Sequence, residues 1–171
     1  MELNTNQYLW NIKSEINLST DPDKLWKIIS APNNLELFHP FCKSNKTINW
    51  AGSESVDQIV YYNDLLYQRD FINWYEGEGY DLLIGEPGGD KSFVSWRIIK
   101  TQESSLSITI YPYKFNKGSK LKNYIPFNVV VKPLLQKYVD SVLLGIDYYI
   151  QHNQKVKKIN LVKFVFFPIR S

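Results

Sequence analysis

Apolar and polar residues alternate over residues 8–18, a pattern that predicts a strand with one buried face. The segment that follows, STDPDKLWKIIS, has the spacing of a short amphipathic helix. Thr20 or Asp21 can cap this helix, and Pro22 suits its first turn. The chain therefore opens with a strand and a capped helix.

A second short helix is predicted over residues 33–38, and the step His39-Pro40 ends it, because a residue before proline avoids the helical region. Beyond it the pattern is that of strands, separated by turns rich in Gly, Asn, Asp and Ser. Short loops between successive strands indicate an antiparallel meander. The predicted strands are residues 43–50, 56–63, 65–75, 80–85, 93–100 and 106–113.

Helical spacing returns between Pro126 and His152. Pro133 lies inside this stretch and marks either the true start of the helix or a kink. Residues 154–171 form a basic and apolar extension, which we expect to add a strand or to cover a surface. The apolar stripe of the helix consists of Leu134, Leu135, Tyr138, Val142, Leu143, Ile146, Tyr149 and Ile150.

The composition fits one domain with a substantial core, since the chain has 171 residues and 44% of them are hydrophobic. Aromatic residues, at 15%, favour strands. A single Cys excludes an internal disulfide and fits a reducing compartment. The N-terminus lacks the basic start and apolar core of a signal peptide, and no apolar run reaches the roughly 18 residues of a membrane helix. We expect a cytoplasmic protein.

Charge is distributed unevenly. Residues 1–103 hold nine basic and 15 acidic side chains, a balance of −6, whereas residues 104–171 hold 11 and two, a balance of +9. The basic third indicates an anionic partner, or else its lysines are solvated or complement the acidic part within the fold. The second interpretation is preferred. Because the lysines are scattered rather than clustered, we expect no nucleic-acid partner.

The motif FHPFC contains the only Cys and one of the two His of the chain, at Cys42 and His39. Such a pair suggests a metal site or a thiol nucleophile with its base. A metal site needs further ligands, yet the other His, His152, ends the long helix. We therefore interpret FHPFC as a structural corner and predict no metal, no cofactor and no catalytic residue.

The order of elements is similar to the helix-grip fold of the START-like superfamily, also called SRPBCC, which includes polyketide cyclase/dehydrase-type proteins. Three segments carry the resemblance: INLSTDPDKLWKIISAPNNLELFHPF, SFVSWRI and VDSVLLGIDYYIQHN. It implies an α+β domain over residues 1–153, with a curved antiparallel sheet of about six to seven strands around a long C-terminal helix. Residues 154–171 lie beyond the family pattern.

The resemblance also implies a cavity between the sheet and the long helix, as such folds hold apolar or amphipathic molecules. Strand parity places Tyr67, Arg69, Phe71 and Asn73 on one face and Trp74 on the other. For Arg69 we favour an ion pair on the outer face over a role in the cavity. The candidate ligand-binding residues are Phe38, His39, Phe41, Tyr67, Arg69, Phe71, Trp96, Leu135, Tyr138 and Val142.

These observations favour a binding protein for a small hydrophobic ligand, such as a lipid, an isoprenoid or a polyketide-like molecule. One alternative is a cyclase or dehydratase in which Arg69 and tyrosines polarise carbonyl groups. Another is an interaction module whose basic third docks on an anionic membrane or an acidic protein. If the extension pairs with a twin subunit, the protein is a homodimer.

Overall fold

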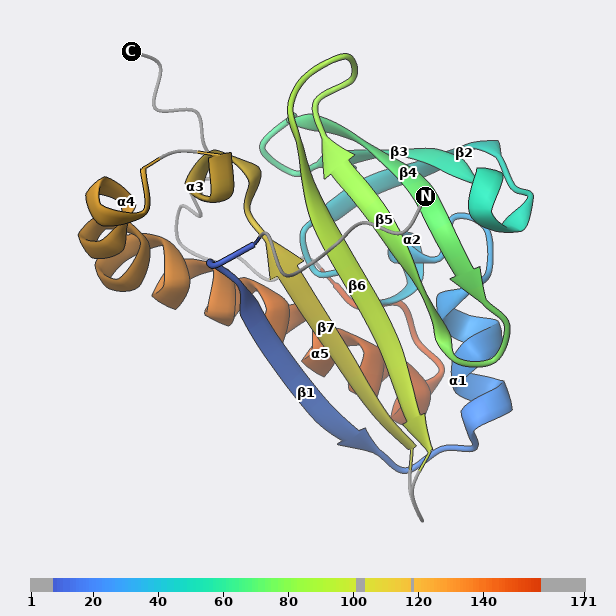
Figure 1. Ribbon diagram of the computed structural model, residues 1–171. Helices are drawn as coiled ribbons and strands as arrows, with labels where there is room; N and C mark the ends of the chain where they lie inside the picture. Colours follow the sequence, from blue (N-terminus) through green and yellow to red (C-terminus); the bar gives the residue numbers. More distant parts are fainter. Residues whose placement is uncertain (1–7, 101–103, 118, 158–171) are drawn as a thin grey trace.

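The computed structural model describes residues 8–100, 104–117 and 119–157, which form an antiparallel sheet and a long C-terminal helix (Figure 1). The sheet has seven strands in the order β1-β7-β6-β5-β4-β3-β2. The predicted meander is confirmed for β2 to β7, and β1 adds to the far edge by pairing with β7. The strands are β1 (Ile12–Leu18), β2 (Cys42–Asn49), β3 (Val56–Tyr61), β4 (Leu66–Tyr75), β5 (Gly79–Gly85), β6 (Lys91–Lys100) and β7 (Ser104–Tyr111).

The two short helices after the first strand are also confirmed. The carboxylate of Asp21 accepts hydrogen bonds from the backbone N–H groups of Asp23 (2.8 Å) and Lys24 (3.2 Å), which makes Asp21 the N-cap. The helices are α1 (Pro22–Ile29), α2 (Leu35–Phe38), the 3-10 turn η2 (Gly52–Glu54), α3 (Tyr113–Lys117), α4 (Lys120–Pro126), the π-helical turn η3 (Phe127–Val131) and α5 (Lys132–His152).

The C-terminal helical region begins earlier than predicted. The segment between the predicted strand that ends at residue 113 and Pro126 contains α3, and helical turns run from Lys120 through η3 into α5. Pro126 ends α4 and is followed by the wider π turn. Pro133 lies in the first turn of α5, where its missing N–H is tolerated.

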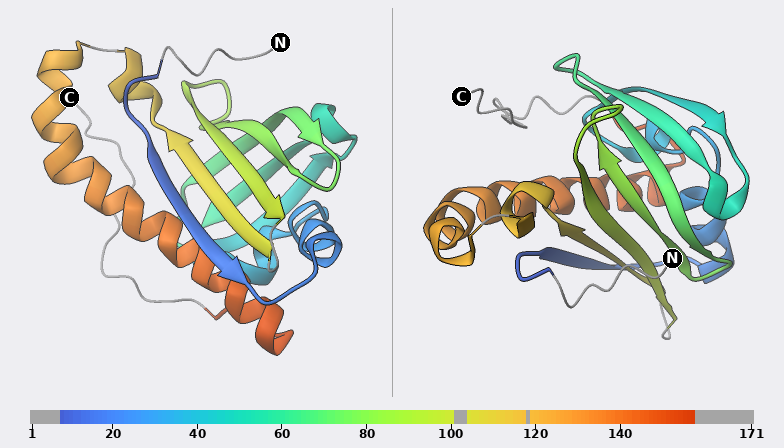
Figure 2. Two further views of the ribbon diagram at one scale, coloured as in Figure 1. Left: turned by 60° about the horizontal axis from the view of Figure 1, so that its bottom comes forward. Right: turned by 45° about the horizontal axis from the view of Figure 1, so that its top comes forward.

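The sheet curls around α5 (Figure 2). On one edge β1 packs along the helix, and at the other end α2 contacts both β2 and α5. The main core lies between the sheet, α1, α2 and the C-terminal part of α5. A second, smaller core lies at the opposite end and consists of Trp10, Ile12, Phe127, Val131 and Leu135. The space between these two cores holds the cavity described below.

A bulge in β4 corrects the predicted strand parity. The register with β5 shifts between Phe71 and Asn73. Phe71 faces the core, and Trp74 also turns inward, where its ring packs against Trp26 and Tyr80. Asn73 points to the opposite face and donates to Asp81 (3.0 Å). One extra residue exchanges the two faces of a strand, and alternation alone does not reveal it.

Gly145 sets the distance between α5 and the corner at the end of α2. A Cβ atom at this position would overlap the carbonyl oxygen of Phe38. Alanine favours helices by about 1 kcal/mol over glycine, yet we expect Gly145→Ala to lower the free energy of unfolding by about 1–3 kcal/mol, because α5 must move away from α2. Denaturant unfolding would measure this. Leu144→Ala, at the exposed neighbouring position, is the control. A Gly145→Ala variant more stable than the parent would contradict this packing.

Within the described residues, no helix is both long enough and apolar enough to cross a membrane. The residues just after α5 return to α2, where the Val156 N–H donates to the carbonyl oxygen of Leu37 (2.9 Å). The strand or covering segment expected of the extension falls largely on residues 158–171, which lie outside the described residues.

Candidate functional site

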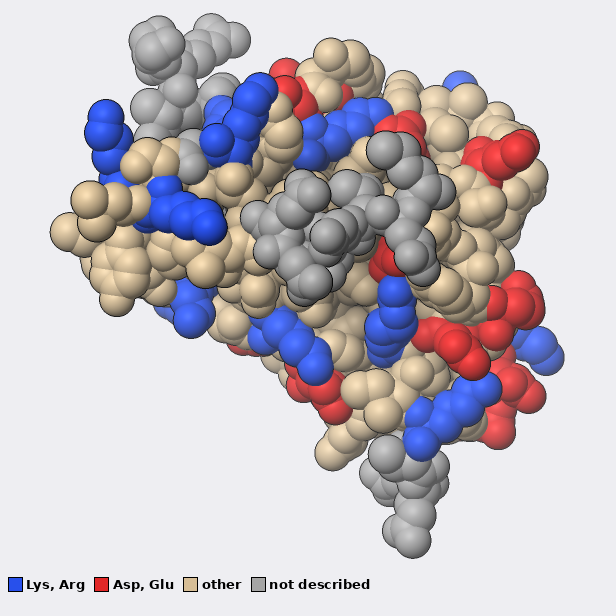
Figure 3. All heavy atoms as spheres, in the orientation of Figure 1, with Lys and Arg blue, Asp and Glu red and all other residues tan. Residues whose placement is uncertain are grey.

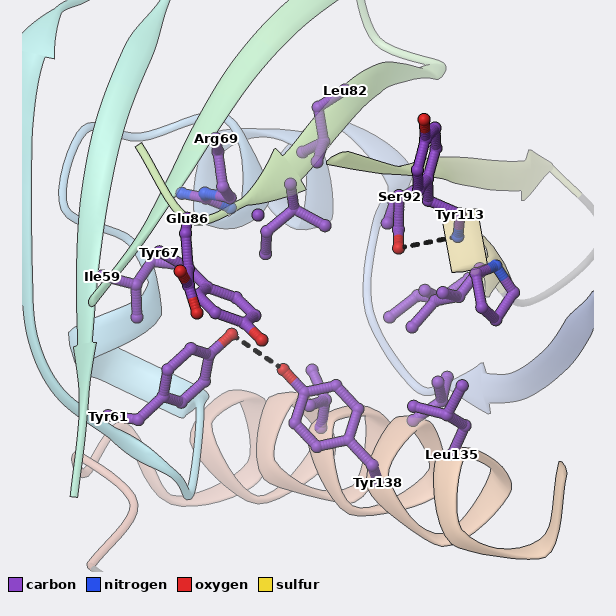
Figure 4. A pocket seen from close by; sticks show the side chains of 18 of the residues that line it. Ile59, Tyr61, Tyr67, Arg69, Leu82, Glu86, Ser92, Tyr113, Leu135 and Tyr138 are labelled. Atoms are coloured by element: carbon purple, nitrogen blue, oxygen red, sulfur yellow. Dashed lines mark hydrogen bonds between the residues drawn. The ribbon is translucent and has the colours of Figure 1, made fainter. Parts of the chain in front are cut away.

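A cavity of about 370 Å³ lies between the inner face of the sheet, α3 and the first half of α5 (Figure 4). This volume is within the range of small-molecule sites. Strands β3 to β7 supply one wall and α5 supplies the other. The apolar lining consists of Leu35, Ile59, Leu82, Ile84, Val94, Trp96, Ile108, Ile110, Phe115, Val131, Leu135, Val139 and Val142.

The structure brings together most of the candidate binding residues named from the sequence. The seven that line the cavity are His39, Tyr67, Arg69, Trp96, Leu135, Tyr138 and Val142. The other three do not line it. Phe38 and Phe71 are buried in the main core, and Phe41 stacks on the outer side of the ring of Tyr138 (5.3 Å between centroids).

Three tyrosine hydroxyls converge at one end of the cavity. Figure 4 shows Tyr61, Tyr67 and Tyr138 pointing toward one another from β3, β4 and α5. The hydroxyls of Tyr61 and Tyr138 are 3.2 Å apart. We call this group, together with His39, the polar end. It places hydroxyl groups against an otherwise apolar wall, which suits recognition of a ligand oxygen.

His39 orients the polar end. Its Nδ1 accepts a hydrogen bond from the backbone N–H of Phe41 (3.3 Å), so the ring proton is on Nε2. Nε2 then donates to the hydroxyl oxygen of Tyr138 (2.9 Å), which lies 3.2 Å from the hydroxyl of Tyr61. The FHPFC corner thus supports the tyrosines, as its histidine holds the hydroxyl of Tyr138 in place.

Burial keeps the polar end uncharged. Burial, together with the positive charge of Arg69, lowers the pKa of His39 to about 3. Burial also raises the pKa of Tyr61 and of Tyr138, and to a smaller degree that of Tyr67, where the carboxylate of Glu86 adds to the effect. At neutral pH the polar end therefore consists of a neutral imidazole and neutral phenols.

This neutral His39 predicts a specific pH dependence of stability. The pKa of the imidazole is about 3 when folded and about 6.5 when unfolded, so between these values the unfolded chain binds a proton that the folded chain does not. The free energy of unfolding should fall as the pH falls through this window, by up to about 1.4 kcal/mol per pH unit from this group. His39→Gln should flatten the slope, and exposed His152→Gln should not. Equal slopes in denaturant titrations of the parent and His39→Gln would contradict the assignment.

Arg69 faces inward, which corrects the preferred expectation of an outer-face ion pair. It is 2% exposed and pairs across the sheet with Asp57 on β3. Its Nε donates to one carboxylate oxygen (2.8 Å) and its Nη2 donates to the other (2.5 Å) and to the side-chain oxygen of Asn34 (3.1 Å). Asn45 donates to the same carboxylate (2.9 Å). The positive charge that borders the cavity is therefore neutralised by a buried partner.

Cys42 is packed and not activated. It opens β2, is 6% exposed, and burial raises the pKa of its thiol to about 12. A nucleophilic cysteine needs the opposite shift. Among the described residues, no three His, Cys, Asp or Glu side chains are grouped so that they could hold a metal ion.

The cavity opens between the β5–β6 hairpin and α3. Exposed residues of both elements line it there, namely Glu86, Gly89, Asp90 and Lys114, together with the half-buried Tyr113. None of these was named from the sequence as a site residue. The hairpin lies between the predicted strands 80–85 and 93–100, where the sequence indicates only a turn. Its place at the mouth follows from the curl of the sheet, which the sequence pattern does not encode.

Comparisons with known proteins show similarity in structure only. No model of a known protein family matches the sequence, and no curated protein matches it. DynU16, from the dynemicin biosynthetic locus, superposes with a TM-score of 0.63 at 7% identity over 85% of this chain, and the match spans 48% of DynU16. This chain therefore corresponds to about half of that protein.

Two further structures match over nearly their whole length. The Aha1 dimer from Colwellia psychrerythraea has a TM-score of 0.62 at 10% identity, over 84% of this chain and 98% of that one. Ara h 8.0201 has a TM-score of 0.60 at 14% identity, over 83% and 97%. These similarities, the seven-stranded curled sheet and the long C-terminal helix confirm the expected architecture: the chain has the helix-grip fold that the resemblance to the START-like (SRPBCC) superfamily implied.

Proposed function

We propose that the protein binds a small apolar or amphipathic molecule in the cavity between the sheet and α5. The observation that carries this proposal is the cavity itself, in which aliphatic and aromatic walls lead to three converging tyrosine hydroxyls. Apolar sites with a few placed polar groups are typical of small-molecule binding. The fold comparisons support a hydrophobic ligand-binding domain without naming its ligand.

The electrostatics of the polar end favour an uncharged ligand. The charge of Arg69 acts on the polar end but is already paired with Asp57, while His39 is neutral. A ligand carboxylate at the polar end would lose its hydration without gaining a counter-ion, which is unfavourable in a buried site. An alcohol, ketone or ester oxygen can instead share hydrogen bonds with Tyr61, Tyr67 and Tyr138. A neutral lipid, isoprenoid or polyketide-like molecule has this chemistry.

The same features favour binding over catalysis. A cyclase-type reaction would use Arg69 to stabilise an enolate, but this guanidinium is held by three hydrogen bonds to Asp57 and Asn34. The neutral His39 and the protonated thiol of Cys42 offer neither a strong acid nor a nucleophile.

The test is to purify the full chain without detergent, extract it with organic solvent and identify co-purified molecules by mass spectrometry. The extract is then supplied again to the delipidated protein, alongside neutral lipids and isoprenoid alcohols. We expect the extract to contain a neutral apolar molecule that raises the melting temperature of the protein. At 100 times its dissociation constant, this molecule should add about 2.7 kcal/mol to the free energy of unfolding. An empty extract together with no thermal shift from any of these molecules would exclude the proposal.

A further inference from the structure

The helical segment that closes the α3–α4 end of the molecule exposes apolar side chains. Leu121, Ile125 and Val129 are 87%, 69% and 67% exposed, and their spacing of four residues places them on one side of the helix. Tyr124 and Val130 lie beside them and are also more than half exposed. We call these five residues the apolar ridge. Contiguous exposed apolar surface of this kind marks a site of interaction.

The segment that carries the ridge is packed against the smaller core. Phe127 and Val131, from the same helical turns, are buried in the smaller core, where the ring of Phe127 packs against Trp10 at 4.9 Å. The inner side of the segment is therefore fixed by packing, and the outer side is presented to the surroundings.

The charges around the ridge have one sign. Residues 104–139 contain six lysines and no Asp or Glu. Of these, Lys120, Lys122 and Lys132 lie within or beside the ridge, and among the described residues they form no ion pair. Figure 3 shows Lys and Arg side chains bordering a largely uncharged surface at the α3–α4 end, while acidic side chains gather at the opposite corner around α1.

We propose that the apolar ridge and its lysines dock the protein on an anionic lipid surface. In this arrangement α4 lies in the plane of the interface, with the ridge inserted at the boundary between headgroups and acyl chains. The lysines meet the negative surface potential. Neither a second copy of the chain nor a nucleic acid suits this surface as well. A second copy would bring lysines against lysines, and a nucleic acid would neutralise the lysines but leave the apolar ridge in water.

Docking in this way brings the cavity to the membrane. Phe115 of α3 and Val131 of η3 line the cavity, and η3 also carries Val129 and Val130 of the ridge. A neutral apolar ligand could then pass between bilayer and cavity without crossing water. This transfer route rests on the proposed function, whereas the docking itself depends only on the surface.

The test is vesicle flotation with the full chain, using phosphatidylcholine vesicles with and without roughly one-third phosphatidylserine. We expect binding to the anionic vesicles only, and weaker binding as salt is raised from about 0.1 to 1 M. Lys120→Gln/Lys122→Gln should weaken partitioning about 5-fold for each lysine removed. Leu121→Ser/Ile125→Ser should weaken it by roughly 10-fold or more.

Matched controls lie elsewhere on the surface. Leu144→Ser, at a 60% exposed position of α5, and Lys24→Gln/Lys27→Gln on α1 should bind as the parent does. Docking through the ridge is overturned if the parent ignores anionic vesicles, or if ridge and control variants bind equally. It is also overturned if sedimentation reveals a dimer that the ridge variants abolish. Ligand-induced thermal shifts measured without vesicles report on the cavity separately.

Discussion

Replacing Asp57 by alanine should lower the free energy of unfolding by about 3–5 kcal/mol, the largest effect expected of any single substitution in the site. The substitution removes the carboxylate that accepts from both Nε and Nη2 of Arg69 and leaves a guanidinium that is 2% exposed without its counter-ion. It also removes an acceptor of Asn45. Denaturant unfolding at neutral pH measures the change.

The surface pair of Lys43 and Asp64 is the matched control for this experiment. Its side chains are 53% and 75% exposed, so Lys43→Ala should leave the midpoint of denaturation unchanged. If Asp57→Ala cost less than about 1 kcal/mol, Arg69 would have to reach water or another anion, and the neutral character assigned to the cavity would be wrong.

Filling the cavity should abolish ligand binding while leaving the fold intact. Val142 lines the cavity from α5, so a tryptophan there occupies space that a ligand would use. We expect Val142→Trp to show no ligand-induced rise in melting temperature. It should lose the whole stabilisation by the ligand, which is about 2.7 kcal/mol at 100 times the dissociation constant. Overpacking should cost no more than about 1–3 kcal/mol, because the new ring enters a void.

Leu144→Trp, on the exposed side of the same helix, is the control and should keep the full shift. Thermal unfolding with and without the extracted ligand gives both quantities. A Val142→Trp variant that retained the shift would place the ligand outside the cavity.

The order of elements could be predicted from the sequence because local signals specify it. Turn residues separate the strands, the carboxylate of Asp21 caps α1, and His39 ends α2 as expected. The α3–α4 region was harder, since the short helix α3 and the π turn depend on packing against Trp10 and Ile12 rather than on periodicity.

The direction of Arg69 shows where sequence patterns stop being sufficient. Parity groups Arg69 with Tyr67 and Phe71 but does not say which side of the sheet is buried. A signal was nevertheless present: Asp57 shares a face of β3 with Ile59 and Tyr61, so a carboxylate and a guanidinium both fall on apolar sides of neighbouring strands. Opposite charges on the apolar faces of two neighbouring strands indicate a buried ion pair.

The site is assembled from residues that are distant in sequence, which explains why its candidates could be only partly identified. His39 meets Tyr138 across 99 positions, and the contact depends on Gly145 allowing α5 to approach the corner after α2. The mouth residues Glu86 and Tyr113 come together only because the sheet curls. No local motif encodes which aromatic residues line the cavity.

Nuclear Overhauser measurements between a protonated apolar ligand and a methyl-labelled, otherwise deuterated chain test the central claim most directly. The ligand is the molecule that gives the largest thermal shift. Contacts to the methyl groups of Ile59, Leu82, Ile108 and Val142 would place it in the cavity, and this is the predicted result. Contacts confined to exposed methyl groups such as those of Ile48, Leu121 and Leu144 would contradict it.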